Sequence, residues 1–428
     1  MLEINTIKNN PDLIIKKLQK RGLDVKQDID LILQLNNQRI ENQQKLDGML
    51  AKGNQLAQNI GQFAKEKKFE KIEELKKIAG QIKIDSKELI EIAKNIEEKI
   101  KKQLIRIPNI PHDTVPEGKD DTNNIVIKTW EREFSDNTNK AEKLLPHWEL
   151  AEKYDIIDFK TGSQITGSGF PVYKNLGAKL QRGLINFFLD YNASAGYTEY
   201  IPPYFVNEDS AFNTGQIPDK EGMMYHINND NLYAIPTAEV PITNMFKNTR
   251  YNHNELPIKC TAYSPCFRRE AGSYGKEVRG LNRLHQFDKV EIVQICDPKY
   301  SYKILEEMVE HVTKLLKELG LKFRIVQLCG GDLGFTSALT YDFEVYSVAQ
   351  KKWLEVSSVS NFETYQANRL NLKCVNEEKK SILCHTLNGS SLALPRIVAT
   401  ILEQNQKENS ITMPVVLHKY LGFDSITM

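Results

Sequence analysis

The sequence predicts an α+β protein, with an N-terminal helical arm followed by a body of mixed strands and helices. Between residues 28 and 104, apolar residues recur at alternating steps of three and four, which is the spacing of a coiled-coil seam. After about residue 126, short alternating strands are broken by Gly and Pro turns and by a few helices. The chain has 428 residues and is 40% hydrophobic, which suffices for two or three domains with at least one large core.

The arm is predicted to be two antiparallel helices. The seam falls into two blocks, whose members are Leu46, Met49, Gly53, Leu56, Ile60 and Phe63, and then Ile72, Leu75, Ala79, Ile82, Ser86, Leu89, Ala93, Ile96 and Ile100. Residues 65–68 form a short polar connection between the blocks, and two long helices joined by a short loop run antiparallel. At about 1.5 Å per residue, each helix would be roughly 50–60 Å long and would project from the body.

The arm is also the basic part of the chain. Residues 1–110 contain 22 Lys and Arg against 16 Asp and Glu, a net charge of +6, whereas the remainder contains 35 against 40, a net charge of −5. Lys65, Lys67 and Lys68 make the tip of the arm lysine-rich. Lysines along a rod suit contact with a phosphate backbone without reading bases. A solvated helical segment or a dimerisation rod would show the same pattern, so charge alone leaves these alternatives open.

Prolines mark the end of the arm. Pro108, Pro111 and Pro116 follow the second helical block closely, and Pro cannot continue a helix. We therefore expect an N-terminal domain at residues 1–105, a linker at residues 106–125 and a second domain at residues 126–428.

Several protein classes have no support in the sequence. The six cysteines begin at Cys260 and none forms a C-x-x-C pair, which favours reduced thiols in a cytoplasmic protein. No secretory signal is visible, and no apolar run approaches the roughly 20 residues that span a bilayer. The overall net charge of +1 does not indicate a globally basic nucleic-acid-binding protein. Rossmann, P-loop, H-E-x-x-H and G-x-S-x-G motifs are absent, so a nucleotide would have to bind in another way.

Two helices and one strand can be placed in the body. Residues 179–192 read as a helix with an apolar stripe, and residues 304–319 read as a second helix that Gly320 ends. The first helix leads into residues 196–201, which we expect to form a strand that ends at Pro202 and Pro203.

Residues 263–293 carry the strongest functional signal and read as strand, glycine-rich basic loop, strand. The period of two predicts that Arg268 and Glu270 share one face of the first strand, and that Phe287, Lys289 and Glu291 share a face of the second. Together they offer a guanidinium for phosphate, an aromatic plate for a base and carboxylates for an amine. A solvent-exposed hairpin with cross-strand ion pairs would have the same pattern, so these residues alone do not decide between the two interpretations.

This stretch resembles motif 2 of the class II aminoacyl-tRNA synthetases, the F-R-x-E hairpin, and with the basic arm it resembles the seryl-tRNA synthetase family in particular. Four further segments resemble that family in its order along the chain, namely residues 169–174 with the helix that follows (motif 1), residues 214–218 with 235–241, residues 355–362, and residues 385–396 (motif 3). The resemblance covers essentially the whole chain. It implies an antiparallel β-sheet flanked by helices as the catalytic domain, and a homodimer formed through motif 1.

The resemblance implies ATP as a substrate, together with Mg²⁺. Arg268 and Arg396 match the catalytic arginines of motifs 2 and 3, which hold phosphate or cover adenine. The ATP-binding set that the family implies is Arg268, Arg269, Glu270, Leu284, Phe287, Glu355, Val356, Ser357, Ser358 and Arg396. Within it, Glu270 would accept from the adenine amino group, Phe287 would stack on adenine, and Glu355 and Ser358 would hold Mg²⁺.

The resemblance also implies a pocket for L-serine. Its members would be Thr237, Ala238, Glu239, Arg268, Glu291 and Ser390, with Glu291 and Ser390 recognising the hydroxyl. A pocket that hydrogen-bonds a hydroxyl rejects alanine, because its own buried polar groups would otherwise remain unpaired. Alternatives remain open at this stage, since Glu291 could form a strand ion pair, and Ser390 and Ser358 could bond only to their own backbone.

The RNA partner that the family implies is tRNA(Ser), while the sequence leaves open whether tRNA(Sec) is also served. The tRNA-binding residues would be Lys65, Lys67 and Lys68 on the arm and Lys276 and Arg279 in the motif 2 loop. Asn368 stands where the family usually has a second Arg, and residues 374–380 are less basic and less glycine-rich than the usual turn. These departures put fine ATP-loop or tRNA contacts in question, and leave the reaction unaffected.

The function implied is therefore that of a serine–tRNA ligase, a cytoplasmic class II synthetase without a DNA or membrane partner. A synthetase-like ligase that charges a carrier protein is one alternative, although such relatives lack the long basic arm. A non-catalytic RNA-binding paralogue is another, although it should have lost Arg268, Glu291 or Glu355, and all three are present.

Overall fold

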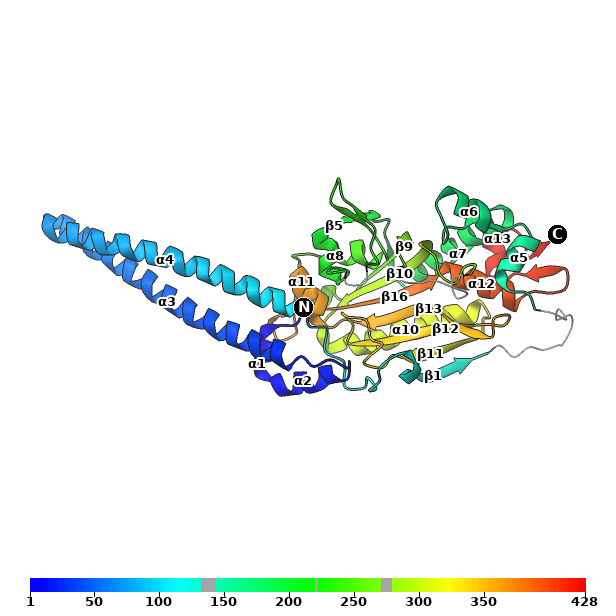
Figure 1. The fold of residues 1–428 in the computed structure, drawn as a ribbon, viewed down its shortest axis with the longest axis horizontal. Coiled ribbons are helices and arrows are strands. Elements are labelled where there is room, and N and C mark those ends of the chain that lie inside the picture. The colour runs from blue at the N-terminus through cyan, green and yellow to red at the C-terminus, as the bar shows by residue number, and fades with distance from the viewer. Residues whose placement is uncertain (132–143, 220–221, 271–278) are drawn as a thin grey trace. The chain divides into compact units, whose positions relative to one another are not determined.

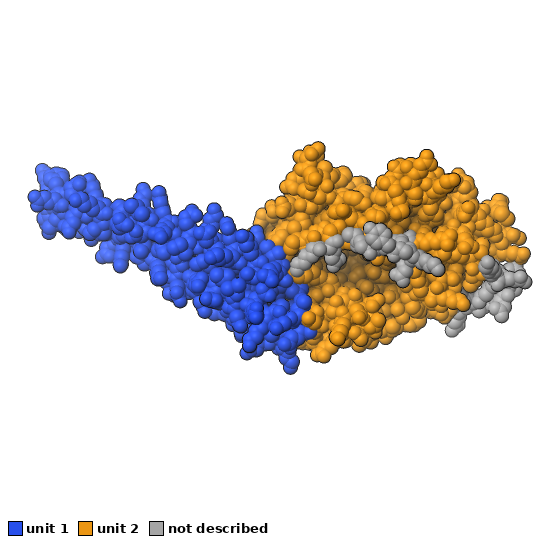
Figure 2. Space-filling model, viewed as in Figure 1, with its two compact units in different colours: residues 1–19, 23–108 blue, residues 20–22, 109–428 orange. Residues whose placement is uncertain are grey.

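A computed structural model describes residues 1–131, 144–219, 222–270 and 279–428. The chain divides into two compact units (Figure 2). The first comprises residues 1–19 and 23–108, and the second comprises residues 20–22 and 109–428.

The first unit is helical throughout its main elements, which are α1 (Ile4–Asn9), α2 (Pro11–Gln19), α3 (Lys26–Lys65) and α4 (Phe69–Leu104). The long helices α3 and α4 lie side by side (Figure 1) and are joined by a turn in which Lys67 has a φ of +58°. The predicted seam is confirmed, because every member of it is buried or half-buried. Ile96 and Ile100, for example, are 8% and 3% exposed, whereas Ile84 and Ile90, which lie off the seam, are 61% and 50% exposed.

A polar residue interrupts the seam without leaving its side chain unpaired. Asn42 is 7% exposed, and its Nδ2 donates to the backbone oxygen of Leu89 across the helix pair at 2.9 Å. A buried amide of this kind favours one register over its neighbours, since a shifted register would remove its hydrogen-bond partner.

The second unit is built on an eight-stranded sheet, which confirms the antiparallel sheet that the resemblance implied. The strand order is β1-β11-β12-β13-β16-β10-β9-β4, and every neighbouring pair is antiparallel except β4 with β9. The strands are β1 (Ile125–Trp130), β4 (Thr198–Glu199), β9 (Ile258–Phe267), β10 (Gln286–Cys296), β11 (Phe323–Gln327), β12 (Leu339–Ser347), β13 (Lys352–Asn361) and β16 (His385–Ala393).

Three helices, α7 (Asn175–Ser194), α10 (Ser301–Glu318) and α12 (Leu394–Gln404), pack on the sheet and form the main core with it. The two predicted helices correspond to α7 and α10, which begin earlier than expected. On β10, Val290 and Ile292 belong to this core. Period-two alternation therefore leaves Phe287, Lys289 and Glu291 for the other face, as expected.

The remaining elements are short and surround the sheet. The helices are α5 (His147–Lys153), α6 (Phe159–Ile165), α8 (Glu208–Thr214), α9 (Glu239–Asn244), α11 (Thr364–Leu370) and α13 (His418–Leu421). The strands are β2 (Ile157–Asp158), β3 (Val172–Tyr173), β5 (Phe205–Asn207), β6 (His226–Ile227), β7 (Leu232–Ala234), β8 (Arg250–Asn252), β14 (Lys373–Val375), β15 (Ser381–Leu383), β17 (Ser410–Thr412) and β18 (Ser425–Thr427). They form four small sheets.

One prediction about the hairpin is wrong. Strand β9 ends at Phe267, so Arg268 and Glu270 lie beyond it and the period of two does not relate their side chains. Glu270 has a φ of +49°, a left-handed conformation that an extended strand does not contain. The predicted strand at residues 196–201 is likewise shorter than expected, because only Thr198 and Glu199 pair with β9.

Over the residues that the structure describes, we find no helix with the length and apolar character needed to cross a membrane.

Candidate active site

A cavity of about 520 Å³ opens on the face of the sheet away from the main core, which is within the usual range for small-molecule sites. Strands β10, β13 and β16, the beginning of α12 and the segments on either side of residues 271–278 supply its wall. The residues singled out from the sequence that line it are Thr237, Glu239, Arg268, Glu270, Leu284, Phe287, Glu291, Glu355, Val356, Ser357, Ser358, Ser390 and Arg396.

Other residues singled out from the sequence lie elsewhere. Ala238 is fully buried at the start of α9, and Arg269 donates its backbone N–H to Met223 O at 2.8 Å; neither lines the cavity. Lys276 lies outside the described residues. The guanidinium of Arg279 lies 5.0 Å from the ring of Trp148. Lys65, Lys67 and Lys68 are exposed at the turn between α3 and α4.

One corner of the cavity is acidic. Glu239 and Glu291 are 7% and 1% exposed, and Asn388 Nδ2 donates to both carboxylates, at 3.0 Å and 2.8 Å. Thr237 Oγ1 donates to Glu291 at 2.9 Å, and Lys289 Nζ lies 2.5 Å from the same carboxylate. Glu291 therefore does form an ion pair within its strand, and it also faces the cavity.

Burial changes the protonation chemistry of this corner. Burial first, and then the charge of Glu291, raise the pKa of Glu239 to about 7, although a hydrogen bond from Gln366 opposes the shift. Burial also raises the pKa of Glu291, against the attraction of Lys289. A carboxyl group in such a position ionises readily only when a cation joins it. The corner therefore suits a ligand that carries an ammonium group beside a hydroxyl donor.

Sequence reasoning missed two residues that organise this corner. Gln366 Nε2 donates to Glu239 Oε1 at 2.7 Å, and its own oxygen accepts from Thr386 Oγ1 at 2.7 Å. Asn388 precedes Ser390 by two positions on β16, so strand alternation could have placed it on the cavity face. No spacing in the sequence points to Gln366, because its partner is 127 residues away.

The part of the cavity around Arg268 and Phe287 is basic and aromatic. The guanidinium of Arg268 lies 5.2 Å from the centre of the Phe287 ring, which is a cation–π distance. The carboxylate of Glu270 pairs with the guanidinium of Arg283. Because Glu270 lines the same cavity, this part offers a guanidinium, an aromatic ring and a carboxylate, to which a phosphorylated purine could bind through phosphate, ring and exocyclic amine.

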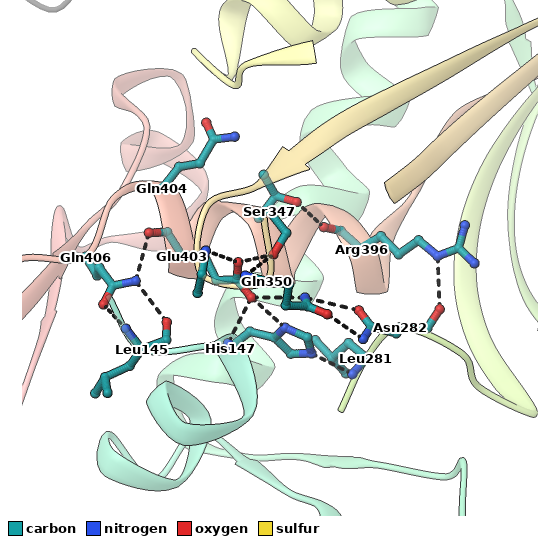
Figure 3. Close-up of polar contacts among 12 residues, drawn as sticks. Leu145, His147, Leu281, Asn282, Ser347, Gln350, Arg396, Glu403, Gln404 and Gln406 are labelled. Atoms are coloured by element: carbon teal, nitrogen blue, oxygen red, sulfur yellow. Dashed lines mark hydrogen bonds and ion pairs between the residues drawn. The ribbon is translucent and has the colours of Figure 1, made fainter. Parts of the chain in front are cut away.

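Arg396 is held by backbone carbonyl groups at the edge of the cavity. Its Nε donates to Asn282 O at 3.0 Å, as Figure 3 shows, and its Nη1 donates to Glu355 O at 2.7 Å. The Glu355 carboxylate lies 3.8 Å from the same Nη1. Two fixed carbonyl partners orient the planar guanidinium and so restrict the direction from which an anion can approach it.

Oxygen donors suited to a hard cation lie on β13. Glu355 and Ser358 both line the cavity, and Ser358 pairs in register with Asp342 of β12. Burial and the charge of Glu355 raise the pKa of Asp342 well above its ordinary value. Among the described residues, no group of three or more His, Cys, Asp or Glu forms a complete metal site. This donor set fits Mg²⁺, which proteins commonly bind through one or two side chains and the phosphates of a nucleotide.

Two family models match the chain. The seryl-tRNA synthetase N-terminal domain matches residues 1–111, and the tRNA synthetase class II core domain (G, H, P, S and T) matches residues 224–405. Curated relatives match over nearly their full length. The serine–tRNA ligase of Salinibacter ruber is 44% identical over 428 residues, covering 100% of this chain and 99% of the relative. That of Carboxydothermus hydrogenoformans is 42% identical, with coverage of 100% and 99%.

Solved structures agree with the sequence comparisons. The seryl-tRNA synthetase from Pyrococcus horikoshii complexed with ATP superimposes with a TM-score of 0.92 at 33% identity, over 100% of this chain and 99% of that one. The cytoplasmic serine–tRNA ligase from Naegleria fowleri in complex with AMP has a TM-score of 0.88 at 25% identity, with the same coverage. With both parts of the chain matched and full-length relatives above 40% identity, the chain belongs to the seryl-tRNA synthetase family of class II aminoacyl-tRNA synthetases.

Proposed function

We propose that the chain is an enzyme that activates L-serine with ATP and transfers the serine to the 3′ end of tRNA(Ser). The observation that carries the proposal is the division of one cavity into an acidic corner, around Glu239 and Glu291, and a basic aromatic side, around Arg268 and Phe287. The acidic corner suits the ammonium group of an amino acid. The basic aromatic side suits the phosphates and the base of a nucleoside triphosphate. Relatives over 40% identical along the whole chain are serine–tRNA ligases.

In the first step, a carboxylate oxygen of serine attacks the α-phosphorus of ATP. A new oxygen–phosphorus bond forms, the bond from the α-phosphorus to the bridging oxygen breaks, and pyrophosphate leaves. Arg268 would hold the α-phosphate beside the serine carboxylate, and Arg396 would hold the γ-phosphate or cover the adenine. Charge stabilisation and alignment of this kind suffice for phosphoryl chemistry without a covalent enzyme intermediate.

The acidic corner would select the amino acid. Glu239 would accept from the serine ammonium group, while Glu291 and Ser390 would meet the hydroxyl, with Thr237 holding Glu291 in place. Alanine has no hydroxyl, so it would leave these buried polar groups unpaired, and this penalty discriminates strongly.

The ATP side would use the remaining cavity residues. Phe287 would stack on adenine, and Glu270 would accept from its amino group. Leu284, Val356 and Ser357, which line the cavity, and Arg269, which does not, complete the proposed ATP-binding set. Glu355 and Ser358 would hold Mg²⁺, which when bound neutralises charge on the phosphates.

In the second step, a ribose hydroxyl oxygen at the tRNA 3′ end attacks the carbonyl carbon of seryl-adenylate. An ester bond forms, the bond from the carbonyl carbon to the phosphate oxygen breaks, and AMP leaves. The proton of the ribose hydroxyl passes to the departing phosphate. Lys65, Lys67 and Lys68 would bind the tRNA backbone through the arm, and Lys276 and Arg279 would meet the acceptor end. A homodimer through the motif 1 segment, tRNA(Sec) as a second substrate and a cytoplasmic location remain part of this proposal.

Serine-dependent exchange of pyrophosphate into ATP tests the proposal. We expect exchange with L-serine, far less with threonine, alanine or glycine, and esterification of tRNA(Ser) by the same preparation. Folded protein that binds tRNA but shows no exchange with any of the four amino acids would be a non-catalytic RNA-binding protein, and this result would overturn the enzymatic assignment.

A further inference from the structure

A fully buried His–Glu pair lies behind the wall of the cavity. His147, the first residue of α5, and Glu403, in the last turn of α12, both have fully buried side chains. The Nδ1 atom of His147 lies 2.9 Å from Glu403 Oε1, and the backbone N–H of His147 donates to the same oxygen at 3.1 Å. Neither residue lines the cavity, so any role in the reaction would be indirect.

The hydrogen bonds of the imidazole determine its protonation state. The backbone N–H of Leu281 donates to His147 Nε2 at 2.8 Å. A backbone N–H can only donate, so Nε2 must be unprotonated and the neutral ring must carry its hydrogen on Nδ1, which donates to Glu403. Burial by itself opposes ionisation of Glu403, but hydrogen bonds from His147 and Ser347 hold the pKa of Glu403 below its ordinary value. The pair is therefore a neutral donor on a buried carboxylate.

The same pair connects to Arg396 by a closed series of contacts, which Figure 3 shows. Arg396 and Glu403 are seven positions apart on α12 and so lie on one side of the helix. Glu403 holds His147, His147 holds the N–H of Leu281, and the carbonyl of the next residue, Asn282, accepts from Arg396 Nε at 3.0 Å. Leu281 and Asn282 are consecutive residues of the cavity wall. Both are thus held by contacts that lead to α12, Leu281 through His147 to Glu403 and Asn282 directly to Arg396.

Two further observations show how tightly this wall segment is fitted. Gly280 has a φ of +69°, and a Cβ atom there would lie 2.3 Å from His147 Nε2. The side chain of Asn282 donates to Gln350 at 2.8 Å, and Gln350 in turn donates to Glu403 at 3.3 Å. The backbone at residues 280–282 therefore passes directly against the imidazole and cannot shift without breaking several of these contacts.

We propose that His147 is a positioning residue for the ATP side of the site, which fixes Leu281 and Asn282 and, through the Asn282 carbonyl, orients the Arg396 guanidinium. The inference rests on the proposed function, because that function assigns Arg396 to ATP. His147 should affect the ATP side and not the acidic corner, since none of the contacts that we describe for Glu239 and Glu291 involves His147.

Two substitutions at one position separate positioning from folding. The side-chain amide of His147→Asn can replace Nδ1 and donate to Glu403, but it cannot reach the Leu281 N–H. The longer His147→Gln can place its oxygen near the position of Nε2 and accept from Leu281, while the bond to Glu403 is lost. We expect His147→Asn to raise the KM for ATP about fivefold to tenfold, the equivalent of one lost hydrogen bond, with the KM for serine changed less than twofold.

The partner variants sharpen the test. We expect His147→Gln to recover most of the affinity for ATP while lowering the melting temperature more than His147→Asn does. Gly280→Ala should reproduce the rise in KM for ATP with His147 intact. His311→Asn is the control: His311 is a half-buried histidine whose Nε2 contacts Asn192 at 2.7 Å and which does not line the cavity. The KM for ATP of this variant should stay at the wild-type value.

A double-mutant cycle tests the route through Arg396. If His147 acts by orienting Arg396, then His147→Asn should add less than twofold to the KM for ATP in an Arg396→Ala background. Four results would each overturn the inference. The KM values for ATP and serine could rise equally in His147→Asn, or the KM for ATP could stay unchanged in folded His147→Asn. The KM for ATP could also rise equally in His311→Asn, or the effects of His147→Asn and Arg396→Ala on it could be fully additive. Failure of the proposed function would look different, since the wild-type protein would then lack serine-dependent exchange altogether.

Discussion

The amide nitrogen of Asn388 donates one hydrogen bond to Glu239 and another to Glu291, at 3.0 Å and 2.8 Å. One side chain thus connects the carboxylate assigned to the serine ammonium group with the carboxylate assigned to the hydroxyl. Both carboxylates are buried, so each needs donors to remain ionised. Asn388 therefore fixes the distance between the two halves of the proposed amino-acid pocket.

We predict that Asn388→Leu raises the KM for serine at least tenfold, because two hydrogen bonds to charged groups are lost at once. The KM for ATP should change little. Steady-state exchange with each substrate varied in turn measures both. Asn361→Leu is a suitable control, because Asn361 is a fully buried sheet residue whose Nδ2 donates to Ser301 and which does not line the cavity. A loss of affinity for serine in the control alone would contradict the role given to Asn388.

The raised pKa of Glu239 predicts a pH dependence of serine binding. With a pKa of about 7, surrounded by Glu291, Lys289 and Arg268, Glu239 takes up a proton as the pH falls, and its neutral form attracts the ammonium group less. The KM for serine should therefore rise as the pH falls below 7, by up to about tenfold per pH unit, while the KM for ATP does not follow it. Exchange rates measured between pH 5.5 and about 8 give both profiles.

The isosteric variant supplies the control. Glu239→Gln should have a high KM for serine that no longer depends on pH in this range. The same shift affects folding with a defined sign: because the folded-state pKa lies above the ordinary 4.5, this group contributes stability that is fully present below about pH 4.5 and is lost as the pH rises through 7. A pH-dependent KM that survives in Glu239→Gln would assign the titration to another group.

Ser390 is expected to contribute to the selectivity for serine over alanine. Removing its hydroxyl with Ser390→Ala should lower the ratio of kcat/KM for serine to that for alanine by roughly tenfold, since one partner of the substrate hydroxyl is lost. Competition between the two amino acids in pyrophosphate exchange measures this ratio. The neighbouring Ser391 is buried, donates to Asn192 at 2.9 Å and does not line the cavity, so Ser391→Ala should leave the ratio unchanged. Equal loss of selectivity in both variants would remove Ser390 from the pocket.

Removing the arm should separate serine activation from tRNA charging. Replacing residues 36–96 by a short Gly/Ser linker removes most of α3 and α4 at points where the helices face each other, as the contact from Asn42 to Leu89 indicates. Exchange of pyrophosphate should remain near the wild-type rate, while charging of tRNA(Ser) should fall by orders of magnitude. Equal charging by the truncated protein would refute the role assigned to the arm.

A milder version of this test changes only charge. Replacing Lys65, Lys67 and Lys68 by Glu should weaken tRNA binding and reduce its dependence on salt, because fewer counterions are then released from the RNA backbone. The helix pair should keep its helicity, since these side chains are exposed. Circular dichroism and tRNA binding at two salt concentrations measure the two effects.

The sequence by itself determined the arm. Its seam follows a period set by helix geometry, so positions such as Ile96 and Ile100 could be placed on the buried side before any contact was known. Strand alternation worked equally well for Phe287, Lys289 and Glu291. It failed at Arg268 and Glu270, because β9 already ends at Phe267 and the backbone beyond it is not extended, with a positive φ at Glu270. Alternation carries no information about where a strand ends.

Only the tertiary structure decided which residues act together. Gln366 meets Glu239 across 127 positions, Asn388 meets Glu239 across 149, and His147 meets Glu403 across 256. No local period can encode such pairs, since they arise when strands and helices that are distant in the chain pack around one core. The sequence therefore specified the elements and the chemistry that each carries, while packing decided which buried charges share a donor.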